Sequence, residues 1–169
     1  MHGDALPDVY GGFGTSLRFY GVDFSIGFTY QLGGQVLDQG YRFYMNSPAG
    51  TSTGNNYHHD LLNSWTPENS GSNIPRFAYN DSNQAAVSDR FLTSASYLNI
   101  QNITLGYTLP KRITRKFLVE NLRIYLACDN VWYWSKRQGL DPRQAINGIT
   151  NPYYYAPIRT FSGGVTVTF

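Results

Sequence analysis

Apolar and polar residues alternate without a break over residues 22–32, and this pattern constrains the fold more than any other feature of the sequence. The apolar positions are Val22, Phe24, Ile26, Phe28, Tyr30 and Leu32. Because the side chains of a β-strand alternate between its two faces, the pattern predicts a long strand with one apolar and one polar face. Residues 13–19 alternate in a similar way, and the Tyr20-Gly21 step between the two segments suits a tight turn. We therefore expect a β-hairpin.

Three later segments carry the same alternation, at 97–109, 122–134 and 159–169. In the first of them the apolar parity changes at Gln101-Asn102, which indicates a β-bulge or a change of environment. The connections between the five predicted strands are alternately short (20–22, 110–121) and long (33–95, 135–158). The long ones are rich in Gly, Ser, Asn and Pro, which favour turns and loops. Residues 35–45 could extend the preceding strand, and residues 57–64 could form a short helix.

The length of the strands favours a transmembrane barrel. Strands of soluble sheets usually have about five or six residues, whereas transmembrane strands need about 9–11. In the last strand, Phe161 and Phe169 enclose Gly163, Val165 and Val167, and they span on the order of 20 Å along the membrane normal. Outer-membrane barrels join their strands by short periplasmic turns and long external loops, and aromatic girdles border their apolar band. Trp132-Tyr133-Trp134 would lie in the external girdle.

This interpretation assigns the two faces of each strand to different surroundings. Residues predicted to face lipid are Phe24, Ile26, Phe28, Ile124, Leu126, Val165, Val167 and Phe169. Residues predicted to face a water-filled lumen are Arg123, Asp129 and Thr166. The predicted fold is all-β, an antiparallel meander of about five long strands.

Composition excludes several other classes of protein. Charged residues make up 14% of the chain, the net charge is +2, and aromatic residues make up 16%, with 14 tyrosines. A charge this small argues against nucleic-acid binding. Cys128 is the only cysteine, which excludes an internal disulfide and a zinc site built from several cysteines. No apolar run approaches the roughly 20 residues of a transmembrane helix.

Motifs for catalysis or cofactor binding are not recognisable. The sequence shows no nucleophile triad, no phosphate-binding loop and no carboxylate pair placed for glycoside hydrolysis, so we expect no enzyme activity and no cofactor. His58-His59-Asp60 offers metal-ligating side chains, but adjacent histidines rarely share a face and no further ligand is spaced for a tetrahedral site. We therefore expect no metal there, and favour a solvated loop or a helix start. The basic segment 111–116 is expected to be a solvated turn or to contact anionic lipid headgroups.

A soluble carbohydrate-binding β-sandwich is the main alternative, because its strands also alternate and the chain is rich in Tyr and Trp. The length of the strands, the alternating loop lengths and the final Phe169 argue against it. An extracellular β-rich enzyme is a weaker alternative, for want of a catalytic constellation.

Several blocks resemble, in order, the late part of the SusC/RagA family of TonB-dependent outer-membrane transporters. They are residues 10–34, 65–69, 88–92, 96–110, 139–142 and 157–169. The resemblance implies that residues 1–169 are the C-terminal part of a 22-stranded transmembrane β-barrel, contributing its last five strands. The plug domain, the TonB box and the signal peptide of such a transporter are absent from this sequence.

The resemblance also implies a function. It implies import of oligosaccharides or peptides across the outer membrane of a Gram-negative, Bacteroidetes-like cell, with the TonB complex as energy source. The implied partners are a SusD-like surface lipoprotein, outer-membrane lipids and the substrate, but no nucleic acid. Trp65, Tyr153, Tyr154 and Tyr155 lie in the presumed external loops and are candidates for substrate contact, since aromatic rings stack on sugars and peptide side chains. An interfacial belt, loop packing or contact with the lipoprotein would also explain them.

Overall fold

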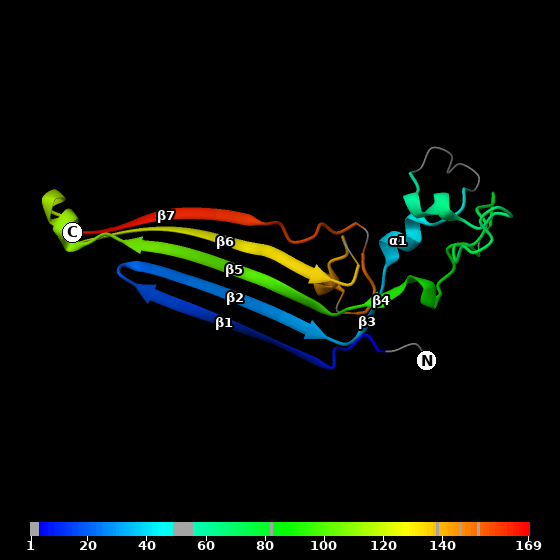
Figure 1. Cartoon of the computed structure of the whole chain (residues 1–169), viewed down its shortest axis with the longest axis horizontal. Coiled ribbons are helices and arrows are strands. Elements are labelled where there is room, and N and C mark those ends of the chain that lie inside the picture. The colour runs from blue at the N-terminus through cyan, green and yellow to red at the C-terminus, as the bar shows by residue number, and fades with distance from the viewer. Residues whose placement is uncertain (1–3, 49–55, 82, 138, 146, 152) are drawn as a thin grey trace.

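A single antiparallel sheet forms the body of the molecule (Figure 1). The computed structural model describes residues 4–48, 56–81, 83–137, 139–145, 147–151 and 153–169. The five strands are β1 (Val9–Phe19), β2 (Val22–Leu32), β5 (Tyr97–Thr108), β6 (Asn121–Ser135) and β7 (Thr160–Thr168). Their order in the sheet is β1-β2-β5-β6-β7, so each strand pairs with the next long strand in the chain. The predicted meander of five long strands is confirmed.

The short connections lie at one end of the sheet and the long connections lie at the other, as Figure 1 shows. At one end Tyr20 and Gly21 join β1 to β2, with φ angles of 46° and 86°. Two consecutive positive φ angles are typical of the type I′ turn, whose twist matches that of a β-hairpin. The other short connection holds α2 (Lys111–Thr114) and the 3₁₀ turn Arg115–Phe117. Both long connections lie at the opposite end, as the alternation of loop lengths predicted.

The strand register brings the apolar residues of all five strands to one face. Phe13 pairs with Phe28, and their rings stack with centroids 4.8 Å apart. Further along the sheet, Phe24 pairs with Leu105 and Ile124 pairs with Val165. Side chains of directly opposed residues lie on the same face of a sheet, so the apolar stripes of successive strands merge into one surface.

Two irregularities in the ladders preserve this surface. Ile26 pairs with Ile103 and Phe28 pairs with Ile100, so β5 has one more residue than β2 between the two pairs. The parity change at Gln101-Asn102 is therefore a bulge, as expected, and the apolar residues on both sides of it share a face. A second register shift lies between β5 and β6, where Asn130 has a φ of 51°.

The apolar face is uncovered, and the buried core lies elsewhere. Leu126 is 64% exposed and Val165 is 61% exposed. The buried apolar clusters instead gather residues of the long connections: Val36, Ala95, Leu140 and Ala145 form one, and Leu37, Met45 and Phe91 form the other. A β-sandwich would need a second sheet packed on the apolar face, and the described residues place none there.

The long connections contain short elements of their own. The first holds β3 (Gln35–Leu37), α1 (Gln39–Tyr44), two 3₁₀ turns (His59–Asn63 and Asp89–Phe91) and β4 (Leu92–Ser94), and the second holds the 3₁₀ turn Pro142–Gln144. The 3₁₀ turn at His59–Asn63 agrees with the short helix expected around 57–64. No helix within the described ranges is long and apolar enough to cross a membrane.

Residues 35–45 do not extend the preceding strand. Gly33 and Gly34 adopt φ angles of 82° and 75°, which end β2 and turn the chain away from the sheet. β3 then pairs with β4 in a separate two-stranded sheet. Asp38 begins α1, because its carboxylate accepts a hydrogen bond of 2.9 Å from the Tyr41 N–H.

An ion pair on the polar face joins β2 to β6 across the strand between them. The Arg123 guanidinium of β6 donates to both carboxylate oxygens of Asp23 on β2, at 3.1 and 2.5 Å. The pair crosses the intervening strand β5 over Gly106, and a Cβ atom there would meet both Asp23 and Arg123 within 2.5 Å. Only a residue without a side chain leaves room for this contact.

We predict that Gly106→Ala destabilises the protein by displacing the ion pair. Because charged side-chain ends can move aside more easily than backbone, the loss should lie near the lower end of the roughly 1–3 kcal/mol typical of overpacking. Gly71→Ala is the matched control, since a Cβ atom at Gly71 meets nothing within 4 Å. Denaturant titration of the purified protein measures both variants, and equal stability of the two would contradict the assignment.

Candidate functional site

The two long connections dock on each other at one end of the sheet and together form a loop cap, defined as the described residues within 33–96 and 136–159. Leu37 of β3 forms a parallel bridge with Ile149. The Leu37 N–H donates to the Gly148 carbonyl at 2.7 Å, and the Thr150 N–H donates to the Leu37 carbonyl at 3.0 Å. The second connection thus adds an extended segment to the small sheet of the first.

A chain of polar contacts continues this docking. Arg137 follows the end of β6, and its Nε lies 3.0 Å from Oδ2 of Asp38. The same guanidinium lies 3.5 Å above the ring of Tyr41, as a cation–π contact. The Tyr41 hydroxyl donates to Oδ2 of Asp60 at 2.9 Å. Burial raises the pKa of the Tyr41 phenol, and the hydrogen bond to the Asp60 carboxylate raises that pKa further.

His58, His59 and Asp60 bring three ligand atoms within 4.8 Å of one another. The two histidine rings lie closer than their adjacency led us to expect, with centroids 4.7 Å apart. His58 nevertheless has a structural role, because its Nδ1 accepts the Asp60 N–H at 3.2 Å and so begins the 3₁₀ turn. A helix start was expected here, and the absence of a metal stays a prediction.

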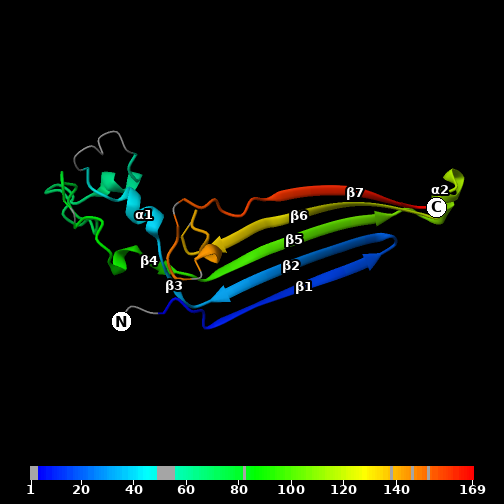
Figure 2. The same cartoon turned by 180° about the vertical axis from the view of Figure 1, so that it is seen from behind.

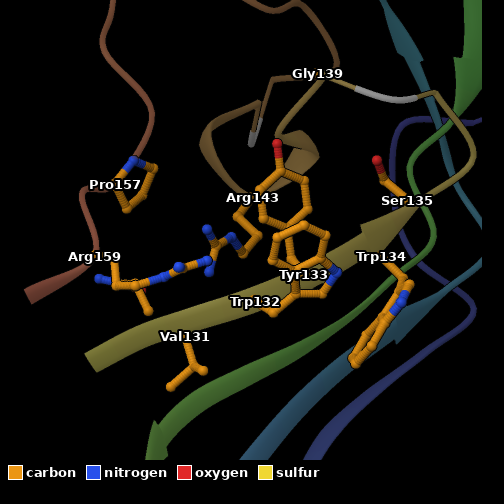
Figure 3. Close-up of a pocket in the computed structure, with 10 residues that line it drawn as sticks. Val131, Trp132, Tyr133, Trp134, Ser135, Gly139, Arg143, Pro157 and Arg159 are labelled. Carbon is orange, nitrogen blue, oxygen red and sulfur yellow. The ribbon is translucent and has the colours of Figure 1, made fainter. Parts of the chain in front are cut away.

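A cavity of about 460 Å³ opens between the end of β6 and the second long connection (Figure 3). β7 pairs with β6 only as far as Asp129, so among the described residues no strand pairs with residues 130–135 of β6 on that side. The Asn130 side chain holds the returning chain by donating to the Ile158 carbonyl at 3.2 Å. The main side chains that line the cavity are those of Trp132, Tyr133, Trp134, Arg143, Pro157 and Arg159.

The two arginines of this cavity differ in their partners. Arg143 forms a two-fold ion pair with Asp141, with distances of 2.8 and 2.6 Å, and this hydrogen bonding raises the pKa of its guanidinium. Arg159 lies 5.7 Å from the ring of Trp132, and among the described residues it has no ion pair. Sequence reasoning did not single out either arginine. The parity that Arg159 shares with Phe161 is the signal that could have placed it beside Trp132.

The candidate substrate-contact residues lie in both halves of the loop cap. Tyr153, Tyr154 and Tyr155 are exposed in the second connection, and Tyr155 is 94% exposed. Trp65 lies in the first connection, where its backbone N–H donates to the Ile74 carbonyl at 2.8 Å. The structure therefore gathers the three tyrosines and places Trp65 in the other connection.

The strand register places the residues predicted to face lipid and those predicted to face the lumen on opposite faces of the sheet. Arg123 pairs with Thr166, and with Asp129 they share the polar face. The strand residues predicted to face lipid lie on the opposite face, and Phe169 follows the end of β7 with 87% of its surface exposed. What each face contacts stays a prediction.

Comparison with known proteins supplies the biological context. No family model matches the chain. It is 27% identical to TonB-dependent receptor P3 of Formosa agariphila, over 99% of this chain and 17% of the relative. It is 28% identical to TonB-dependent receptor SusC of Bacteroides thetaiotaomicron, over 96% of this chain and 15% of the relative. The chain thus spans less than a fifth of the length of these relatives.

Solved structures of a peptide importer contain the same fold. The RagAB peptide importer in its closed-closed state matches 100% of this chain and 18% of its own, with a TM-score of 0.82 and 23% identity. Another structure of the RagAB peptide transporter matches with a TM-score of 0.83 and 24% identity. At this identity the match establishes the fold of the five-stranded sheet and its loops.

We predict that Tyr41 makes the stability of the loop cap depend on alkaline pH. Its folded-state pKa lies above the ordinary value of 10.0, so the folded protein favours the neutral phenol. The stabilisation that the neutral Tyr41 phenol gives to the folded state is complete at pH values below 10.0. It is lost as the pH rises through the raised pKa of the folded state. Tyr41→Phe should remove this part of the pH dependence and, by taking the hydroxyl donor from Oδ2 of Asp60, cost about 1 kcal/mol at neutral pH. Melting temperatures of both proteins between neutral and strongly alkaline pH measure the effect, and parallel curves would refute it.

Proposed function

Because the chain is homologous to SusC/RagA-type TonB-dependent receptors over nearly its whole length, we propose that it forms part of the barrel wall of an outer-membrane nutrient importer. Such receptors are transporters and not enzymes, which agrees with the missing catalytic motifs. The observation that carries the proposal is the uncovered apolar face of the sheet. A surface of this kind is stable against hydrocarbon and unstable against water.

The open edges of the sheet support a larger barrel. Within the described residues, β1 and β7 each pair on one side only. Backbone N–H and C=O groups at a lipid-exposed edge have no water to bind, so a membrane-spanning sheet must close on itself. We propose that this segment supplies the C-terminal five strands of a 22-stranded barrel, and that further strands of the same protein complete its edges.

The arrangement of the loops sets the orientation that we propose. The short connections face the periplasm and the loop cap faces the cell exterior, as is general for outer-membrane barrels. The polar face, with Arg123, Asp129 and Thr166, lines the lumen. Trp132 and Trp134 then mark the external boundary of the apolar band, where aromatic side chains concentrate.

The cargo and partners follow from the same proposal. The solved relatives are described as a peptide importer and a peptide transporter, and we propose oligosaccharides or peptides as the cargo. A SusD-like surface lipoprotein would cover the loop cap, by analogy with the two-component RagAB complex. The TonB complex would supply energy through a part of the importer outside this chain.

Uptake by intact cells tests the proposed function. Cells that carry or lack the full-length gene are given fluorescent oligosaccharides or oligopeptides, with and without an uncoupler of the inner-membrane proton gradient. The proposal requires uptake that depends on both the gene and the gradient, and co-purification of a surface lipoprotein with the tagged importer. Gene-dependent uptake that the uncoupler leaves unchanged would reject a TonB-driven mechanism.

We predict that Val165→Arg in the full-length protein impairs membrane insertion more than Thr166→Arg. An arginine on the lipid face near the bilayer midplane costs about 2–4 kcal/mol, whereas one on the lumen face remains hydrated. The two positions are neighbours in β7, so they test the assigned faces with the same substituent. The yield of heat-modifiable barrel in the outer-membrane fraction measures insertion, and equal losses would reject the faces assigned to β7.

We predict that Tyr155→Ala weakens substrate binding. A stacking contact worth about 0.5–1.5 kcal/mol corresponds to a rise of roughly two- to tenfold in the apparent KM of uptake. Tyr20→Ala is the matched control, because Tyr20 is also highly exposed but lies in the short turn at the opposite end. Uptake kinetics with the labelled cargo measure both, and an unchanged KM for Tyr155→Ala would remove this residue from the substrate contacts.

A further inference from the structure

Arg159 lies where the apolar face of the sheet meets the loop cap. It immediately precedes β7 and shares its sequence parity with Phe161, which is paired with Cys128 on the apolar face. Its guanidinium lies 5.7 Å from the ring of Trp132, and Figure 3 shows it extending from the returning chain toward that ring. We call the part of the cavity formed by Trp132, Trp134, Pro157 and Arg159 the girdle pocket.

The girdle pocket combines a positive charge with apolar surroundings. Arg143 also lines the cavity, but its charge is neutralised by Asp141 at 2.6 Å. Within the described part of the chain, Arg159 has no such counterion. Trp132 and Phe161 are 54% and 75% exposed on the same face. A cation beside an indole ring at the edge of an apolar face matches a ligand with an anionic head and apolar tails.

We propose that the girdle pocket binds the phosphate group of an outer-leaflet lipid. The Arg159 guanidinium donates to two phosphate oxygens, since its planar fork matches phosphate geometry. The indole of Trp132 holds the guanidinium in place, and the acyl chains follow the apolar face beside Phe161. A free anion would gain nothing from the exposed rings around the arginine, and for this reason the lipid is the favoured occupant.

This inference rests on the proposed barrel, and the two can fail separately. A segment outside the membrane would fail the insertion test at Val165, whatever Arg159 binds. Loss of the lipid site alone would leave both membrane insertion and cargo uptake intact.

Lipid binding to the purified full-length importer tests the inference. Native mass spectrometry counts bound bisphosphorylated lipid A at a series of lipid concentrations, with inorganic phosphate as a competitor. Arg159→Gln should weaken binding by about fivefold, which corresponds to roughly 1 kcal/mol for one basic residue near an anionic membrane surface. Arg159→Glu should weaken it further, because it reverses the charge at the same position.

Arg18→Gln is the matched control, since it removes the same charge from an exposed arginine of β1 that pairs with Asp23 on the polar face. The inference requires that Arg18→Gln binds lipid A as the unmodified importer does, and that phosphate at equal concentration does not displace the lipid. Unchanged binding by both Arg159 variants would overturn it, as would an equal loss in Arg18→Gln. Displacement of the lipid by phosphate alone would assign the pocket to a free anion instead.

Discussion

The uncovered apolar face of the five-stranded sheet is the constraint on which the rest of the structure depends. A soluble domain buries such a face in its core, yet here the buried apolar side chains belong to the long connections, around Val36 and Phe91. The sheet is therefore held by its ladders and by contacts within single faces, such as the stacked rings of Phe13 and Phe28. Its stability depends on the medium that covers it, whereas the loop cap, which lies at one end of the sheet (Figure 2), contains a core of its own.

The sheet could be predicted from the sequence because neighbouring residues along each strand are enough to identify it. Alternation with period two identifies each strand, and the parity change at Gln101-Asn102 identifies a bulge. The bulge has a physical reason, since without the extra residue either Ile100 or Ile103 would turn to the polar face. Parity along one strand also fixes which residues share a face, so the grouping of Arg123, Asp129 and Thr166 followed from the sequence as well.

The loop cap could not be predicted, because its contacts join segments that are far apart in the chain and carry no period. Nothing near Leu37 indicates that its backbone will pair with Ile149, or that Arg137 will reach both Asp38 and Tyr41. The error over residues 35–45 has the same origin. Their apolar residues fit a strand. However, Gly33 and Gly34 turn the chain away from the sheet, and Asp38 caps a helix in place of a strand. Docking with the other connection stabilises this arrangement.

On the polar face, several long side chains lie against the sheet because the neighbouring strand has a glycine beneath them. At three places on this face a large side chain lies over a glycine of the neighbouring strand: Asp23 and Arg123 lie over Gly106, Asn102 lies over Gly27, and Tyr125 lies over Gly164. Each side chain can therefore lie down across the next strand instead of projecting away from the sheet. This arrangement places the polar side chains over the backbone of the next strand. In the barrel that we propose, side chains that lie against the wall would leave more of the lumen free for cargo, so a glycine on one strand and a long polar side chain on the next would serve both the sheet and the lumen.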